Sequence, residues 1–458
     1  MPTFPDVDPA TGETIAEIEI TSPEELQRVV AAARAAAPAW AALDLEERAR
    51  LLTRGAEDLG RRAGELADLI TREMGKLRSD ALREAESRAG HVPELLDEVR
   101  RAVAPEVITT DDTETHVVRD PLGVVAAITP WNYPVSMPLS IVIPALATGN
   151  TVVFKPSEHV PLTGALLAEL FGAHLPEGVL GLVQGAGETG AALVDADVDM
   201  IGFVGSRATG KRIMQAAAGG LKRLVLELGG KDPLVVFEDA DLEGAAECAV
   251  RHALRNTGQV CCSVERVYVA DAVAERFEQL VTEKARAWTH GSGFEEGSRM
   301  GPMVSEHQRA KVADQVREAV AQGARLVMGG EPAGGPGWFY PATVLADVGQ
   351  ELRISHEETF GPVVSLTRFS GDEAEAVRLA NDTLYGLGAN VWTADLERGQ
   401  RVARGIRSGQ VGVNRYLAGA PGTPWVGARQ SGFGFLGGIE GHRQFTIPKT
   451  ISWPLATS

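Results

Sequence analysis

Residues 256–263 read Asn256-Thr257-Gly258-Gln259-Val260-Cys261-Cys262-Ser263, and residues 226–231 read Leu226-Glu227-Leu228-Gly229-Gly230-Lys231. The later segment offers a cysteine in a turn behind a glycine. The earlier one places a carboxylate in an apolar strand that breaks at two glycines. A thiol nucleophile and a separate carboxylate base are the two groups that covalent catalysis through a thioester requires. Together the segments predict a cysteine-dependent catalytic centre.

Short apolar runs alternate with helical patterns on the N-terminal side of these segments. The predicted strands are Val124–Thr129, Thr151–Phe154, Val179–Val183, Met200–Val204 and Leu224–Leu228, and a helix is expected over 162–171. Such alternation is typical of a doubly wound parallel sheet, which binds ligands at the carboxyl ends of its strands. A second α/β unit is expected from near Lys231 to about Arg429.

The two ends of the chain have different patterns. The first hundred residues look helical, with capping boxes that start at Ser22 and Asp44. Residues 103–118 are rich in β-branched side chains and predict a hairpin, with which a lone strand at 444–454 could pair. We therefore expect a cofactor-binding domain (1–102 and 119–229), a catalytic domain (230–430) and an oligomerisation element (103–118 and 444–458).

Composition limits the class of protein. A chain of 458 residues is too long for one core, and 44% hydrophobic with 23% charged residues is typical of a soluble globular protein. A net charge of −18 argues against nucleic acid and anionic membranes as partners, and a carboxylated substrate would need a local cation. Three cysteines, two of them adjacent, do not make a disulfide framework. With no signal-peptide pattern at the N-terminus, a cytoplasmic location is expected.

These segments, with the motifs described below, resemble the aldehyde dehydrogenase superfamily from about Asp8 to Thr446. The resemblance implies an α/β fold with a Rossmann-type cofactor domain, a second α/β catalytic domain and a small β oligomerisation element. It implies a homodimer or homotetramer. It also implies NAD-dependent, non-acylating oxidation of an aldehyde to a carboxylic acid.

The resemblance assigns three catalytic residues. Cys261, two residues after a glutamine, would be the nucleophile, although the adjacent Cys262 competes for that role. Asn132 ends a predicted strand, and its amide would stabilise the oxyanion without titrating. Glu227 would activate the water that hydrolyses the thioester. Cys248 lies in a helical pattern and is expected in the core.

For the cofactor, the resemblance indicates Ile128, Trp131, Lys155, Glu158, Gly185, Gly205, Ser206, Glu358 and Phe360. The turn at Gly205 and Ser206 opens a helix, and small residues there let backbone amides approach a pyrophosphate. The Glu158 carboxylate would repel a 2′-phosphate, so NAD is expected in preference to NADP. From the residues alone, Lys155 and Glu158 could equally form a solvated loop, and the glycines from Gly185 could form a plain turn.

Three residues are candidates for contact with the substrate. Arg255 matches an arginine that binds the substrate carboxylate in succinate-semialdehyde dehydrogenases. Two further polar groups of those enzymes are replaced here, by Ser140 and by Gly419-Ala420. The alternative is an arginine in a structural ion pair at the end of its helix. Tyr416 and Trp425, near the expected pocket, favour an aromatic or medium-chain aldehyde instead.

The chain departs from the family at two polar positions. Ile141 and Leu436 stand where many members have groups assigned to proton transfer, so Glu227 would need another proton route. Other classes stay open: a cysteine hydrolase or esterase, which needs a histidine partner that no motif shows, and a catalytically silent homologue. The pair His356-Glu357 has no second ligand pair at helical spacing, and no metal is expected.

Overall fold

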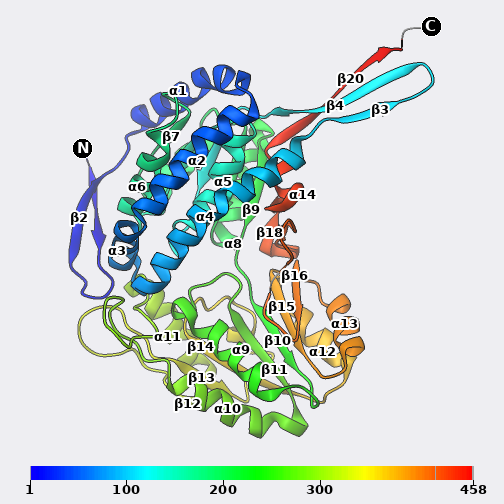
Figure 1. The fold of residues 1–458 in the computed structure, drawn as a ribbon. Coiled ribbons are helices and arrows are strands. Elements are labelled where there is room, and N and C mark those ends of the chain that lie inside the picture. The colour runs from blue at the N-terminus through cyan, green and yellow to red at the C-terminus, as the bar shows by residue number, and fades with distance from the viewer. Residues whose placement is uncertain (1, 418, 456–458) are drawn as a thin grey trace.

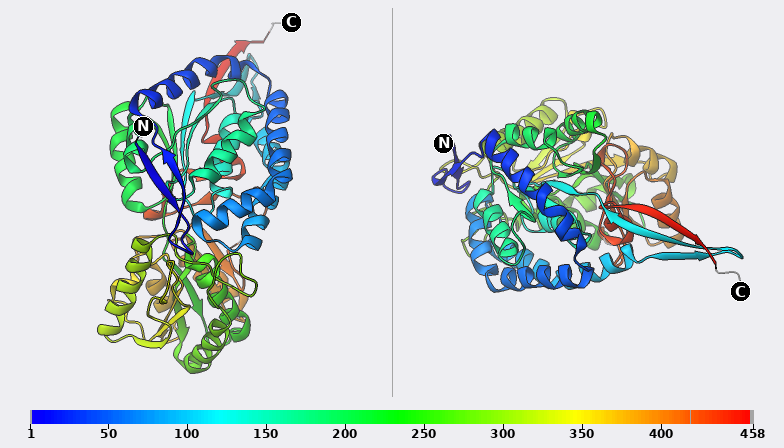
Figure 2. Two further views of the ribbon diagram at one scale, coloured as in Figure 1. Left: turned by 90° about the vertical axis from the view of Figure 1, so that its left-hand side faces the viewer. Right: turned by 90° about the horizontal axis from the view of Figure 1, so that it is seen from above.

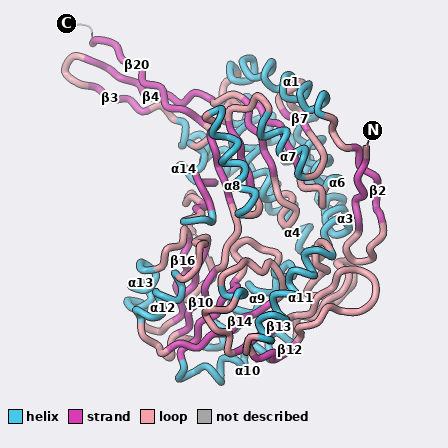
Figure 3. Tube along the Cα trace, turned by 180° about the vertical axis from the view of Figure 1, so that it is seen from behind, coloured by secondary structure: helices cyan, strands magenta, loops and turns pink. Residues whose placement is uncertain are grey.

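The computed structural model describes residues 2–417 and 419–455, which form two α/β units and one slender β arm. In Figure 1 the unit with the six-stranded sheet lies above the unit with the seven-stranded sheet. The arm projects from the upper unit, and it stands away from both units in the right-hand view of Figure 2 and from behind in Figure 3. This is the α/β architecture with two largely parallel sheets that the sequence predicts.

The upper sheet has the strand order β18-β9-β8-β5-β6-β7. Its strands are β5 (Val124–Ile128), β6 (Thr151–Lys155), β7 (Leu180–Leu182), β8 (Met200–Val204), β9 (Arg223–Glu227) and β18 (Gly432–Phe433). The first five are parallel and confirm the five predicted strands, whereas β18 is antiparallel. The chain runs from β5 outward to β6 and β7 and returns to β8 on the other side of β5. The topological switch point therefore lies between β5 and β8, where open α/β sheets bind ligands.

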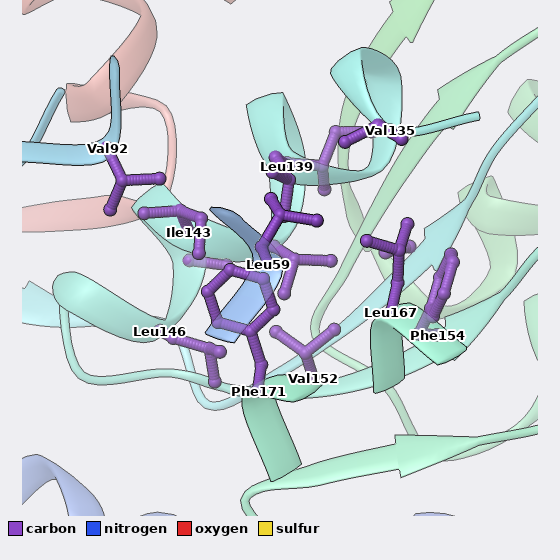
Figure 4. Packing of buried hydrophobic residues seen from close by; sticks show 14 of the residues in the cluster. Leu59, Val92, Val135, Leu139, Ile143, Leu146, Val152, Phe154, Leu167 and Phe171 are labelled. Atoms are coloured by element: carbon purple, nitrogen blue, oxygen red, sulfur yellow. The ribbon is translucent and has the colours of Figure 1, made fainter. Parts of the chain in front are cut away.

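Helices cover both faces of this sheet: α1 (Pro23–Ala42), α2 (Leu45–Arg61), α3 (Ala63–Met74), α4 (Arg78–Val103), α5 (Ser136–Ala147), α6 (Pro161–Gly172), α7 (Gly187–Asp195) and α8 (Arg207–Ala217). The two predicted capping residues are confirmed, because Ser22 and Asp44 accept hydrogen bonds from backbone N–H groups at the start of α1 and α2. Figure 4 shows how α5, α6 and the strand residues interdigitate. A Cβ atom at Gly55 would lie 2.4 Å from the Phe171 ring, so α2 and α6 touch there.

The expectation that the first hundred residues are helical is wrong at their start. An antiparallel hairpin of β1 (Thr3–Val7) and β2 (Thr14–Glu19) precedes α1. Gly12, with φ of 79°, supplies the left-handed residue in the connection. From Ala16 to Ile20 apolar residues alternate with glutamates, which is a strand period, and the helical pattern begins only after the cap.

The lower sheet has the order β12-β13-β14-β11-β10-β15-β16 and is parallel except for β12. Its strands are β10 (Asp232–Val236), β11 (Val264–Ala270), β12 (Arg325–Met328), β13 (Thr343–Ala346), β14 (Val363–Phe369), β15 (Gly388–Trp392) and β16 (Gln410–Val413). Its helices are α9 (Leu242–Leu254), α10 (Ala274–Arg286), α11 (Glu306–Ala321), α12 (Glu373–Asn381) and α13 (Leu396–Gly405). Cys248 lies buried in α9, as predicted.

The arm is a three-stranded antiparallel sheet of β3 (Glu106–Thr109), β4 (Thr113–Pro121) and β20 (Thr446–Pro454). The predicted hairpin and its pairing with the C-terminal strand are thus confirmed, while residues 456–458 of the predicted element lie outside the described residues. Three short elements link the arm to the lower unit: β17 (Trp425–Val426), β19 (Phe435–Leu436) and α14 (Gly438–Arg443).

Among the described residues no helix combines the length and the apolar character that a bilayer crossing requires.

Candidate active site

The cysteine turn follows α9 and connects it to β11. Asn256 and Thr257 are non-glycine residues with φ of 49° and 57°, a conformation that costs energy and clusters at functional sites. Gly258 has φ of 70°, and a Cβ atom there would lie 2.1 Å from the carbonyl oxygen of Gly361. Only glycine fits, because the turn is pressed against the loop that carries Glu358 and Phe360.

Asn132 lies in the loop between β5 and α5 and contacts the cysteine turn, which belongs to the other unit. Its Nδ2 donates a hydrogen bond to the Gln259 carbonyl oxygen at 3.1 Å. The Asn256 amide in turn donates to the carbonyl oxygens of Asn132 and Gln259, at 3.3 and 3.1 Å. The predicted oxyanion donor therefore lies beside the predicted nucleophile, although the two come from different sheets.

The two adjacent thiols differ in exposure and in charge. Cys261 is partly exposed and Cys262 is buried. The hydrogen bond between the thiols, helped by the Arg255 guanidinium, lowers the pKa of Cys262 to about 6. The same hydrogen bond and burial raise the pKa of Cys261 well above its usual value. These opposite shifts favour a proton on Cys261 and the negative charge on Cys262, so Cys261 must lose its proton before it can attack.

Glu227 is the last residue of β9, and its carboxyl group lies in apolar surroundings. Burial raises its pKa well above the usual value, the neighbouring Trp425 side chain opposes that shift, and the Glu227 Oε1 is buried without a hydrogen-bond partner among the described residues. Ile141 and Leu436, which replace the family's polar groups, are buried at 0% and 4% exposure. Trp425 therefore lies close to the predicted base, and it packs in one cluster with Cys261 and Tyr416.

Glu358 faces the start of the lower unit. It accepts a hydrogen bond from the Gly230 N–H at 3.1 Å. Burial and the nearby Glu265 raise its pKa to about 7. A Cβ atom at Gly229 would lie 2.5 Å from the Glu358 carboxylate oxygens, so the double glycine after Glu227 makes room for this side chain.

Phe360 is held by a buried ion pair that sequence reasoning missed. Glu265 accepts hydrogen bonds from the N–H groups of Thr359 and Phe360, at 2.8 and 2.9 Å, and pairs with the Lys231 ammonium at 2.6 Å. Phe360 has φ of 54°, and its ring meets Trp131 edge-on at a centroid distance of 5.5 Å. The Lys231–Glu265 pair therefore fixes the loop that closes the site on this side.

A cleft of about 830 Å³ opens at the switch point of the upper sheet, between α7 and α8. Six predicted cofactor residues line it: Ile128, Trp131, Lys155, Glu158, Gly205 and Ser206. Gly185 lies just before the lining residue Ala186, and Glu358 and Phe360 lie on the loop beyond Trp131. Arg212 of α8 also lines the cleft and was not predicted, because nothing in the sequence marks one arginine of a surface helix.

The cleft fits a dinucleotide. The N-terminus of α8 opens at Ser206, whose hydroxyl accepts a hydrogen bond from the Thr209 N–H at 3.2 Å. A Cβ atom at Gly205 would lie 2.5 Å from the Phe203 ring, so this turn excludes side chains and leaves backbone amides for a phosphate. Lys155 is buried at the wall, where burial lowers its pKa and the Glu158 carboxylate opposes that effect. A cation and a carboxylate side by side suit ribose hydroxyl groups.

Arg255 follows the last residue of α9 and begins the turn that leads to the two cysteines. Its Nη2 donates to the Tyr416 hydroxyl at 3.1 Å, and that hydroxyl donates to the Cys262 carbonyl oxygen at 2.6 Å. The ring of Tyr416 stacks on His252 at 3.4 Å. The Arg255 Nε is buried without a partner, and no carboxylate in the described part of the chain pairs with the guanidinium. The structural ion pair considered as an alternative is therefore absent from the described residues.

Comparison with known proteins gives a consistent result. The sequence model of the aldehyde dehydrogenase family matches residues 2–451. A betaine aldehyde dehydrogenase of Bacillus subtilis is 38% identical over 456 residues, which cover 97% of this chain and 93% of that protein.

Solved structures agree with the sequence match. Lactaldehyde dehydrogenase from Escherichia coli superposes with a TM-score of 0.96 at 35% identity, covering 99% and 96% of the two chains. An E. coli NADP-dependent enzyme gives 0.95 at 35% identity, covering 99% and 95%. Betaine aldehyde dehydrogenase from Staphylococcus aureus, in complex with NAD+, gives 0.94 at 33% identity, covering 98% and 91%.

Proposed function

The chain belongs to the aldehyde dehydrogenase family, and from that premise we propose that it oxidises an aldehyde to a carboxylic acid through a thioester on Cys261, with NAD as the oxidant. The observation that carries this proposal is the convergence of three groups from separate segments. The Asn132 amide is tied to the cysteine turn, and the Glu227 carboxyl group is close enough to raise the pKa of Cys261.

The residues of the chain divide the reaction between them. Once Cys261 has lost its proton, its sulfur bonds to the aldehyde carbon and the carbonyl oxygen becomes an alkoxide. Asn132 Nδ2 donates one N–H to the Gln259 carbonyl oxygen and has a second N–H that can donate to the alkoxide. NAD held by the residues that line the cleft would supply the two-electron oxidation of the thiohemiacetal carbon by hydride transfer, which leaves a thioester on Cys261. Glu227 then takes a proton from water, whose oxygen attacks the thioester and releases the acid and the Cys261 thiol.

The cofactor proposal is NAD in preference to NADP. It rests on Glu158, which lines the cleft beside Lys155, because a carboxylate there would repel a 2′-phosphate. The relatives do not decide the question, since one solved structure is an NADP-dependent enzyme and another binds NAD+.

Glu158→Gln should therefore improve use of NADP. Removing one carboxylate at short range should contribute about 1 kcal/mol, or roughly fivefold in kcat/KM for NADP. The measurement is the kcat/KM ratio of the two cofactors in the parent and the variant. Glu188→Gln, which removes an exposed carboxylate from the same cleft, is the matched control and should leave the ratio nearly unchanged. Equal kcat/KM for NAD and NADP in the parent would contradict the proposal.

The substrate proposal is an aldehyde that carries a carboxylate, such as succinate semialdehyde. The Arg255 guanidinium lies close enough to the thiols to lower the pKa of Cys262, its Nε is buried without a partner, and no carboxylate among the described residues pairs with it, which leaves it able to bind a substrate carboxylate. Tyr416 is occupied by contacts with His252 and Arg255, which weakens the case for an aromatic or medium-chain aldehyde. Betaine aldehyde carries a fixed positive charge, which Arg255 would repel.

Arg255→Leu should lose activity selectively on the acid substrate. The expected loss in kcat/KM for succinate semialdehyde is about 2 kcal/mol, or roughly 30-fold, with little change for an uncharged aldehyde of similar length. NADH formation is measured for both aldehydes and for betaine aldehyde, which the parent should use poorly. Arg251→Leu, one turn earlier on α9 and exposed, is the matched control. Equal losses on both aldehydes would make Arg255 structural, and ester turnover without NADH formation would favour a cysteine hydrolase.

The proposal extends to assembly and location. Val107 and Ile108 on β3 are 56% and 55% exposed, and Trp453 on β20 is 39% exposed. Apolar side chains along the outer strands of a projecting sheet favour pairing with another copy, as a homodimer or homotetramer. All three cysteines are free thiols, and the proposed chemistry needs one of them reduced, which supports a cytoplasmic location.

A further inference from the structure

The loop between α3 and α4, residues 75–77, lies between the two halves of the site. Its central residue, Lys76, is almost fully buried, with 3% of its side chain exposed. The ammonium is 2.5 Å from Glu84 Oε2, and the Glu84 side chain is 5% exposed. Such a pair is costly to bury, and breaking it leaves a lone charge in the interior. Neither residue has a role in the chemistry proposed above.

Glu84 and Lys76 both contact the segment that carries Asn132. Glu84 Oε1 accepts hydrogen bonds from the N–H groups of Val135 and Ser136, at 3.2 and 2.9 Å, and so caps the start of α5. The Lys76 ammonium lies over the Tyr133 ring, 4.1 Å from its centroid. The residues on the C-terminal side of Asn132 are thus held by one buried ion pair.

The same loop contacts the support of the cysteine turn. Gly75 is so close to residues 301–302 that a Cβ atom on it would lie 2.4 Å from the Pro302 ring. That segment holds the turn, because the Gly301 carbonyl accepts from Thr257 Oγ1 at 2.9 Å. Residues 75–76 therefore connect the Asn132 segment to residues 301–302, which support the cysteine turn.

We propose that Lys76 and Glu84 are positioning residues that hold the Asn132 amide in register with the Cys261 turn. The inference rests on the proposed role of Asn132 as the oxyanion donor. Asn132 and Cys261 belong to different units, so an anchor that contacts both segments adds to the direct hydrogen bonds between Asn132 and the cysteine turn. Such preorganisation matters most when charge develops on the carbonyl oxygen.

Helix α4 offers a matched control. Glu98, three to four turns after Glu84 on the same helix, is also buried. It too accepts from a backbone N–H at the start of a helix, that of Gly438 at 3.3 Å, and pairs with a basic side chain, His442 at 3.1 Å. It differs from Glu84 in its partners, which belong to α14 and not to the Asn132 segment.

The test is a double-mutant cycle on the full-length enzyme. Glu84→Gln keeps an acceptor for the N–H groups of α5 and removes the charge. It should slow the NADH burst by roughly 10- to 100-fold, while the Kd for NAD and the KM for aldehyde change little. In an Asn132→Ala background, Glu84→Gln should cause no further loss, because the group that it positions is gone. Glu98→Gln should leave the burst rate unchanged in the parent enzyme. In the Asn132→Ala background it should also cause no change.

Each contrary outcome is distinguishable. Additive losses from Glu84→Gln and Asn132→Ala, or an equal loss in Glu98→Gln, would show that Glu84 has a general structural role. Either result would overturn the positioning role and leave the oxyanion role of Asn132 standing. A normal burst in Asn132→Ala would overturn the oxyanion role itself, and with it this inference. If Glu84→Gln does not fold, Lys76→Met/Glu84→Gln leaves no lone buried charge and takes its place in the cycle.

Discussion

Replacing Cys261 by alanine should abolish aldehyde oxidation, with kcat lowered by roughly 10⁴-fold or more, because no other group can hold the acyl intermediate. NAD should still bind, since the cleft between α7 and α8 has no contribution from the cysteine turn. Steady-state NADH formation and a fluorescence titration with NAD measure the two properties on the same sample.

Cys262→Ala is the matched control and should keep most of the activity. Its pH profile should also move. The hydrogen bond and the charge of Cys262 raise the pKa of Cys261, so their removal should lower that pKa. The NADH burst should then reach half its maximal rate at a lower pH than in the parent. An inactive Cys262→Ala beside an active Cys261→Ala would reverse the assignment of the nucleophile.

Glu227→Gln should release one equivalent of NADH rapidly and then stall. Acylation of Cys261 needs no activated water, whereas hydrolysis of the thioester does, so kcat should fall by roughly 10²- to 10⁴-fold while the burst persists. Glutamine keeps the size of the side chain, so the pocket should be preserved, and it removes the ability to accept a proton. Stopped-flow detection of NADH separates the burst from turnover.

The pH dependence of the parent gives a second test of Glu227. Burial raises the pKa of this carboxyl group, and only the deprotonated form can accept a proton from water. Steady-state kcat should therefore be low in mild acid and rise as the pH passes through that raised pKa. Hydrolysis in Glu227→Gln should lose this rise. Normal steady-state turnover in the variant would remove Glu227 from the mechanism.

The elements predicted well are those whose signal is local. The strands from Val124 to Leu228 are apolar runs between turn residues, and the helix caps at Ser22 and Asp44 need only four consecutive residues. The N-terminal hairpin was missed because the long helical pattern that follows it outweighed the short alternating run from Ala16 to Ile20.

The supports of the site were not predictable in the same way. The ion pairs Lys76–Glu84 and Lys231–Glu265 support the site because their carboxylates accept hydrogen bonds from backbone N–H groups of other loops. Those loops lie far away in the sequence. A single sequence shows a lysine or a glutamate in such places but not its partner. The environment of Arg255 illustrates the same limit. The sequence around Arg255 would be the same whether or not a distant carboxylate paired with its guanidinium.

The pairing of β18 with β9 has a consequence for the newly synthesised chain. Gly432 and Phe433 lie opposite Glu227 and Leu226, and the Leu228 N–H donates to the Ser431 carbonyl oxygen at 2.8 Å. Until these late residues leave the ribosome, β9 is the unprotected outer strand of its sheet, and the carboxyl group at its end lacks Trp425. The N-terminal unit can collapse earlier around its local contacts, but its last strand must wait for a contact of very long sequence separation. The end of β9 that carries Glu227, the proposed water-activating residue, is therefore expected to be completed among the last steps of biosynthesis.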